Sequence, residues 1–166
     1  EINFGVPDTT VQQYVNEYKE YTSNMIDWIQ AIDPTRPITH GDNQVAGNVN
    51  DLRTQVDMLL AESGGVVGLN YSPGAYSRVH QQYPDWPLVG SETASSINSR
   101  GVYYSKAKHT ETGNYQNTAY DTHCVSWEQR ARAAWLPVIS NDFMMGTFIW
   151  TGFDYIGEPT PYNSDA

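Results

Sequence analysis

Residues 66–71 have the sequence VVGLNY, a short run that is apolar on both faces and ends in two polar side chains. Such a run is typical of a strand buried in a parallel sheet whose two faces are both covered. Further short apolar runs occur before and after it. Together they predict four strands, at residues 37–40, 66–71, 87–91 and 144–153.

Helical periodicity fills the intervals between these predicted strands. Apolar residues recur at three- and four-residue steps in four segments, which we expect to be helices: 11–32, 52–60, 75–83 and 127–139. Helix and strand therefore alternate along the chain, a pattern that indicates a parallel sheet with crossover helices. No glycine-rich phosphate loop follows any of the strands, so a nucleotide-binding sheet is not favoured. Residues 94–125 form a long polar stretch, which we interpret as a loop.

Composition excludes several classes of function. The 166 residues include 9 basic and 19 acidic side chains, which gives a net charge of −10. This charge argues against a nucleic-acid partner and against an anionic membrane surface. No run approaches the roughly 20 apolar residues that a membrane span needs, and Glu1 to Gly5 show no signal-peptide pattern.

The cysteine and histidine content gives little support for metal or thiol chemistry. Cys124 is the single cysteine, so an internal disulfide and a multi-cysteine metal site are excluded. The four histidines lack zinc-ligand spacing, and we expect no transition-metal site. Aromatic residues make up 13% of the chain, with 12 Tyr and 5 Trp, which suits either a carbohydrate cleft or core packing.

Polar side chains gather where the predicted strands end. They are His40, Asp42 and Asn43, then Asn70 and Tyr71, then Glu92, and finally Trp150 and Asp154. In a (β/α)₈ barrel this edge carries the active site. Four βα units are half of such a barrel, and an open wedge of four strands leaves two unpaired edges and an exposed apolar face.

Glu92 is the strongest catalytic candidate, because a carboxylate at the mouth of a buried strand is costly unless it is paired or used. The alternative interpretation is a structural salt bridge or a strand-end cap. Glycoside hydrolysis needs a second carboxylate, roughly 5 Å away for retention and roughly 6.5–9.5 Å away for inversion. The candidates for it are Asp42, Asp154, Glu158 and Glu1.

Two aromatic residues also have alternative roles. Trp150 is either a platform for a sugar ring or part of the core. Tyr71 either donates a hydrogen bond to a catalytic carboxylate or anchors a loop.

The segment GSETASSINSRG at residues 90–101 resembles the nucleophile segment of glycoside hydrolase family two β-galactosidases, in particular the large multidomain, often cell-surface enzymes of Gram-positive bacteria. Three further stretches agree in the same order. They are DPTRP leading into GDN within 33–43, GGVVGLNYS at 64–72, and GTFIWTGFDY at 146–155 running into GEPTP at 157–161.

The resemblance implies roles for individual residues. Glu92 matches the catalytic nucleophile at the end of the seventh barrel strand, and Tyr71 matches the sixth-strand tyrosine that hydrogen-bonds it. Trp150 matches the eighth-strand tryptophan of the galactose subsite. The opening Glu1-Ile2-Asn3 looks like the fourth-strand acid/base motif cut just before its glutamate, so Glu1 is the expected acid/base.

Asp42 and Asn70 are the remaining expected substrate-binding residues. No metal ligand is assigned in this chain. Some members of the family hold Mg²⁺ or Na⁺, and the metal dependence of the complete enzyme stays open.

The implied fold is the C-terminal half of a catalytic TIM barrel, with residues 1–166 running from the end of strand four to just past strand eight. The implied function is retaining exo-hydrolysis of terminal non-reducing β-D-galactose from oligosaccharides or glycans. Its partners are the β-galactoside, the missing N-terminal half-barrel and flanking β-sandwich domains. The expected location is extracellular or at the cell surface, with the cytoplasm as the alternative.

Two other functions stay open. One is a non-catalytic half-barrel that needs a partner half or pairs with itself as a homo-oligomer. The other is a family-two glycosidase of different sugar specificity, a β-glucuronidase or a β-mannosidase.

Overall fold

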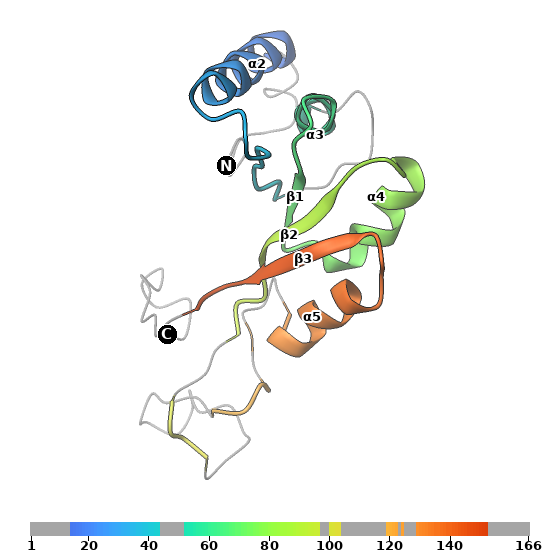
Figure 1. Ribbon diagram of the computed structural model, residues 1–166. Helices are drawn as coiled ribbons and strands as arrows, with labels where there is room; N and C mark the ends of the chain where they lie inside the picture. Colours follow the sequence, from blue (N-terminus) through green and yellow to red (C-terminus); the bar gives the residue numbers. More distant parts are fainter. Residues whose placement is uncertain are drawn as a thin grey trace.

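The computed structural model describes residues 14–43, 52–96, 100–103, 119–122, 124 and 129–152 (Figure 1). The elements in these parts of the chain are α2 (Val15–Ile32), α3 (Leu52–Glu62), β1 (Val67–Asn70), the short 3₁₀ helix η1 (Pro73–Ala75), α4 (Tyr76–Gln82), β2 (Leu88–Thr93), α5 (Ala131–Ile139) and β3 (Met144–Ile149). The alternation predicted from periodicity is therefore confirmed for the described residues. Glu1, Asp154 and Glu158 lie outside them.

The three strands form one parallel sheet in the order β1-β2-β3, so each strand lies beside its neighbour in the sequence. The predicted strand at 37–40 also lies beside β1, but it pairs through isolated parallel bridges, Thr39 with Val66 and Asp42 with Leu69. Val66 N donates to Ile38 O at 2.8 Å, and Asn70 N donates to Asp42 O at 2.8 Å. This segment thus extends the parallel arrangement without forming a continuous strand.

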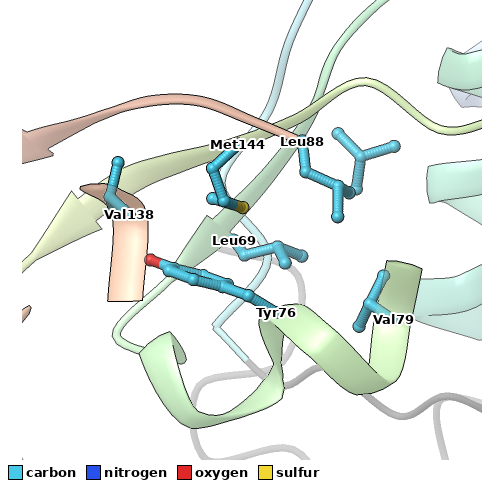
Figure 2. Packing of buried hydrophobic residues seen from close by; sticks show 7 residues of the cluster. Leu69, Tyr76, Val79, Leu88, Val138 and Met144 are labelled. Atoms are coloured by element: carbon cyan, nitrogen blue, oxygen red, sulfur yellow. The ribbon is translucent and has the colours of Figure 1, made fainter. Parts of the chain in front are cut away.

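The helices after residue 52 cover one face of the sheet. Val67 and Leu69 of β1 form the core with Leu88 of β2 and Met144 of β3. Figure 2 shows Leu69, Leu88 and Met144 from close by. The helical side chains of this cluster are Tyr76 and Val79 of α4 and Val138 of α5, and Ala61 of α3 packs against it. Parallel strands joined by right-handed crossovers in sequential order place every helix on the same face.

A second, smaller core joins α2 to α3. Ile26 of α2 is buried against Val56 and Leu60 of α3. Gln30 Nε2 donates to Ser63 O at 3.1 Å and ties the end of α2 to the turn after α3. Of the described helices, none combines the length and the apolar character that crossing a membrane would require.

The register of the sheet is interrupted in β2. Gly68 pairs with Val89 and Asn70 pairs with Glu92, so two steps along β1 match three steps along β2. On the other side, Gly90 pairs with Thr147 and Thr93 with Ile149, so three steps along β2 match two along β3. Both neighbours therefore place a β-bulge in the region from Gly90 to Glu92.

Candidate functional site

The carboxyl ends of the parallel strands bring several of the expected residues together. Asn43 follows the bridged segment, Asn70 ends β1, Tyr71 comes next, and Ser91 and Glu92 lie near the end of β2. This clustering agrees with the expectation that polar residues at strand ends share one edge of the sheet.

Tyr71 and Glu92 are joined by two hydrogen bonds. The Tyr71 hydroxyl donates to Glu92 Oε1, and the Tyr71 backbone N donates to Glu92 O at 2.7 Å. Tyr71 has a φ of +48°, a left-handed conformation that is uncommon for residues other than glycine. The chain thus turns sharply after β1, and this turn carries the phenol ring to the carboxylate of the neighbouring strand.

The bulge in β2 determines where Glu92 lies. A Cβ added to Gly90 would meet Tyr76 Oη at 2.7 Å and Thr147 Oγ1 at 2.5 Å, so this position faces the helices. Thr93 Oγ1 also lies 2.7 Å from Thr147 Oγ1. Positions three apart lie on opposite faces of a regular strand, whereas here they share one. The bulge therefore places Ser91 and Glu92 in succession on the face away from the helices.

Asn70 connects three neighbouring segments of the sheet. It is 5% exposed. Its Nδ2 donates to Asn43 Oδ1 at 2.8 Å, and its Oδ1 accepts from Ser91 Oγ at 2.7 Å. Both ends of this side-chain amide thus contact the protein, although an amide retains further donor and acceptor capacity.

Two glycines allow the neighbouring segments to approach Asn70 and Ser91 closely. A Cβ at Gly41 would lie 2.7 Å from the Asn70 amide atoms. A Cβ at Gly68 would lie 2.0 Å from the backbone oxygen of His40 and 2.7 Å from Ser91 Oγ. These distances leave no room for any larger residue, because real Cβ contacts do not come so close.

For Asp42 and Trp150, two further predicted site residues, the structure gives the burial and the position along the chain. Asp42 is 4% exposed, and alternation puts its side chain on the opposite face from Gly41 and Asn43. Trp150 follows β3 directly, with its backbone N donating to Thr93 O at 2.8 Å, and it is 42% exposed. The sugar-binding roles of Asp42, Asn70 and Trp150 stay predictions, as does the acid/base role of Glu1, which lies outside the described residues.

His40, which the sequence groups with the strand-end cluster, lies elsewhere. Its Nε2 is 2.7 Å from Oδ1 of Asp57 in α3, so it belongs to the interface between the sheet and that helix. Ser91 is the residue that sequence reasoning missed. The only signal for it was its position directly before Glu92, because its contact with Asn70 depends on strand register. Within the described residues, no group of three or more His, Cys, Asp or Glu side chains could hold a metal ion.

Parallel strands in sequential order, with polar side chains at their carboxyl ends, are the arrangement found in (β/α)₈ barrels, whose active sites lie at those ends. The chain belongs to glycosyl hydrolase family 2, because the family described as "Glycosyl hydrolases family 2, TIM barrel domain" matches residues 13–163. Among curated proteins, the chain is similar to "Beta-galactosidase BoGH2A" of Bacteroides ovatus. The two are 30% identical over 156 residues, which cover 87% of this chain and 18% of that relative. The chain thus spans less than a fifth of the length of the curated relative it matches.

Proposed function

We propose that this chain supplies the nucleophile half of a retaining exo-β-galactosidase. The observation that carries the proposal is the hydrogen bond from the Tyr71 hydroxyl to Glu92 Oε1 at the carboxyl edge of the sheet. This bond holds the Glu92 carboxylate in one orientation, and a carboxylate is one of the side chains that attack as nucleophiles in glycosidases. The name of the Bacteroides ovatus relative, a beta-galactosidase, supports galactose as the sugar.

The proposed reaction is a double displacement. One carboxylate oxygen of Glu92 attacks the anomeric carbon, and the bond to the leaving oxygen breaks as that oxygen takes a proton from Glu1. Glu1 then removes a proton from water, the water oxygen attacks the anomeric carbon, and the ester to Glu92 breaks. The sugar leaves with its original anomeric configuration, and both carboxyl groups return to their initial protonation states.

The proposed domain is the second half of a TIM barrel, strands five to eight. It is supported by the four parallel segments in sequential order and by the helices on a single face. In doubly wound sheets, by contrast, the strand order reverses and helices cover both faces. The remaining strands would come from the longer protein or from a second copy of the chain.

The test uses the full-length protein that contains this chain and nitrophenyl glycosides of galactose, glucuronic acid and mannose. We expect release of nitrophenol from the β-galactoside, and loss of that release in Glu92→Gln, which preserves size but removes the negative charge. A 2-deoxy-2-fluoro-galactoside with a good leaving group should leave a covalent adduct on the peptide that contains Glu92.

Each alternative has its own outcome. An adduct on another carboxylate would contradict the role of Glu92. Faster release from the glucuronide or the mannoside would keep the mechanism and replace the sugar. Asp142→Asn serves as the control, since this exposed residue lies before β3 at the opposite edge of the sheet.

A further inference from the structure

We propose that Asn70 is a positioning residue, which holds the Tyr71–Glu92 pair in its reactive geometry by bridging the loop at Asn43 to the bulge at Ser91. This inference rests on the proposed function, because it assigns the nucleophile to Glu92. It differs from the sequence expectation, in which Asn70 binds the sugar.

The first support is that Asn70 is bonded through every polar group it has. Its side-chain amide bonds Asn43 and Ser91. Its backbone N donates to Asp42 O at 2.8 Å, and its backbone O accepts from Ser72 Oγ at 2.9 Å. A buried side-chain amide bonded at both its nitrogen and its oxygen, on a backbone that is itself bonded, is fixed in one orientation, because turning it would leave desolvated polar atoms without partners.

The second support is where these bonds fall along the chain. Ser91 directly precedes Glu92, and Tyr71 directly follows Asn70. Asn70 therefore acts one peptide away from each member of the Tyr71–Glu92 hydrogen bond. The bond to Ser91 also holds the bulge of β2, the part of the strand where the backbone departs from regular pairing.

The third support is the packing around the amide. Gly41 and Gly68 allow the neighbouring segments to approach so closely that a Cβ at Gly41 would collide with the Asn70 amide, and one at Gly68 would collide with Ser91. Such close packing transmits a displacement of one side chain to its neighbours. A shift of about 1 Å in a reacting group can lower a rate about 100-fold.

The experiment compares Asn70→Ala and Ser91→Ala with the control Asn141→Ala in the full-length protein. Asn141 is also an asparagine whose Nδ2 donates a hydrogen bond within the protein, to Pro137 O at 2.6 Å. It precedes β3 and therefore lies at the amino ends of the strands, opposite the site. We expect kcat on nitrophenyl β-galactoside to fall about 100-fold in Asn70→Ala. The inhibition constant of a non-hydrolysed thio-β-galactoside should change less than twofold, because ground-state binding does not need the nucleophile in place.

Ser91→Ala should lower kcat in the same direction, and the double variant with Asn70→Ala should be no slower than the slower single variant. Asn141→Ala should keep kcat unchanged. A rise of tenfold or more in the thiogalactoside inhibition constant of Asn70→Ala would instead make Asn70 a substrate ligand. Unchanged kcat in Asn70→Ala would leave it a purely structural residue, and either result overturns the proposal.

A second readout needs no sugar. In protein labelled with ¹³C at glutamate carboxyl groups, Tyr71→Phe should shift the Glu92 carboxyl resonance. We expect Asn70→Ala to produce a shift of its own and to abolish most of the further effect of Tyr71→Phe, whereas Asn141→Ala should do neither. If Glu92 were not the nucleophile, the coupling between Asn70 and Tyr71 at the Glu92 carboxyl resonance would persist. The expected losses of kcat would then not be observed. If the coupling is absent, Asn70 does not position the pair.

Discussion

At the scale of single residues, the site depends on one unusual backbone conformation. Tyr71 adopts a positive φ directly after a buried strand, a conformation that costs energy for a residue with a Cβ. Two hydrogen bonds to Glu92 offset this cost. Conformations of this kind persist where surrounding contacts hold them in place, and they gather at functional sites. The position of the phenol is thus set by the turn as much as by the side chain.

The Tyr71 hydroxyl is open to a direct test. Removing a hydrogen bond to a charged group costs about 1.5–3 kcal/mol, so Tyr71→Phe should lower kcat of the full-length protein by about 10- to 100-fold. Steady-state kinetics on nitrophenyl β-galactoside would measure this effect. Tyr83→Phe is the matched control, because Tyr83 follows α4 and stacks on Trp86 away from the site. If Tyr71→Phe retained kcat within twofold, the bond to Glu92 would have no catalytic role.

A second residue-scale prediction concerns Asp33, which ends α2. The hydroxyl and the backbone N–H of Thr35 both donate to its carboxylate, and these bonds hold the pKa of Asp33 below its usual value. A lowered pKa stabilises the folded state at pH values above the unfolded pKa. That contribution is lost as the pH falls through the folded pKa.

Thr35→Val removes the hydroxyl donor and keeps the backbone donor. The pKa of Asp33 should therefore rise toward its usual value, as followed by NMR titration of the carboxyl group. Thr35→Ser retains a hydroxyl and should keep the pKa low. A pKa that stays the same in Thr35→Val would show that the backbone N–H alone accounts for the shift.

At the scale of elements, the sequence predicted where the strands lie and that they run parallel, but not their register. The buried run at 66–71 and the shorter run at 87–91 both became strands, because continuous apolar stretches bounded by turns have few other structures open to them. The β-bulge at Gly90 to Glu92 was not predictable, since an extra residue leaves the local apolar pattern unchanged. The hydrogen bond from Ser91 to Asn70 depends on that bulge, because in the sheet Asn70 is aligned with Glu92, and this explains why the contact was not predicted.

The start of α5 illustrates the same limit. Periodicity predicted a helix from 127, whereas α5 begins at Ala131. The N-terminus of α5 is bonded by side chains distant in sequence. Ala131 N donates to Ser96 Oγ at 2.8 Å, and Arg132 N donates to Asp121 Oδ2 at 3.0 Å. No local pattern shows that a loop carboxylate will satisfy these free N–H groups.

Removing this cap should weaken α5. A carboxylate at a helix N-terminus accepts the free N–H groups and interacts favourably with the helix dipole. We expect Asp121→Ala to lower the free energy of unfolding by about 1 kcal/mol, measured by urea denaturation. Asp142→Ala, at an exposed position beyond the other end of α5, should change it by less than about 0.5 kcal/mol. Equal effects of the two substitutions would rule out a capping role for Asp121.

At the scale of the whole molecule, helices cover one face of the sheet, and among the described residues no further strand pairs with the outer edge of β3. On α2, the side chains of Tyr21, Met25, Trp28 and Ile32 are exposed and follow a spacing of four, three and four residues, which places them on one stripe. On β3, Met145 and Phe148 are also exposed. A stripe of this size on a surface helix is typical of an interaction face. In the proposed half-barrel, these surfaces would pack against the rest of the closed barrel.

The chain alone should therefore associate with itself. Burying the α2 stripe removes apolar surface from water, which stabilises the associated state by roughly 25 cal/mol for each Å² buried. We expect size-exclusion chromatography with light scattering to give a mass above the 18.7 kDa of one chain at micromolar concentration. Trp28→Lys combined with Ile32→Lys should move the mass toward a single chain, because a charge on the stripe would have to be desolvated on association.

Ser23→Lys is the control, since it adds a lysine to an exposed position of α2 outside the stripe, and it is compared with each single stripe variant, which adds the same charge. Association that is weakened by the stripe variant and unaffected by the control would identify α2 as a packing surface. The same stripe variant should then reduce hydrolysis by the full-length protein, where the surface has to close against the other half of the barrel. A parent chain that stays monomeric at every concentration would contradict the open-edge interpretation, because exposed strand edges and apolar stripes favour pairing.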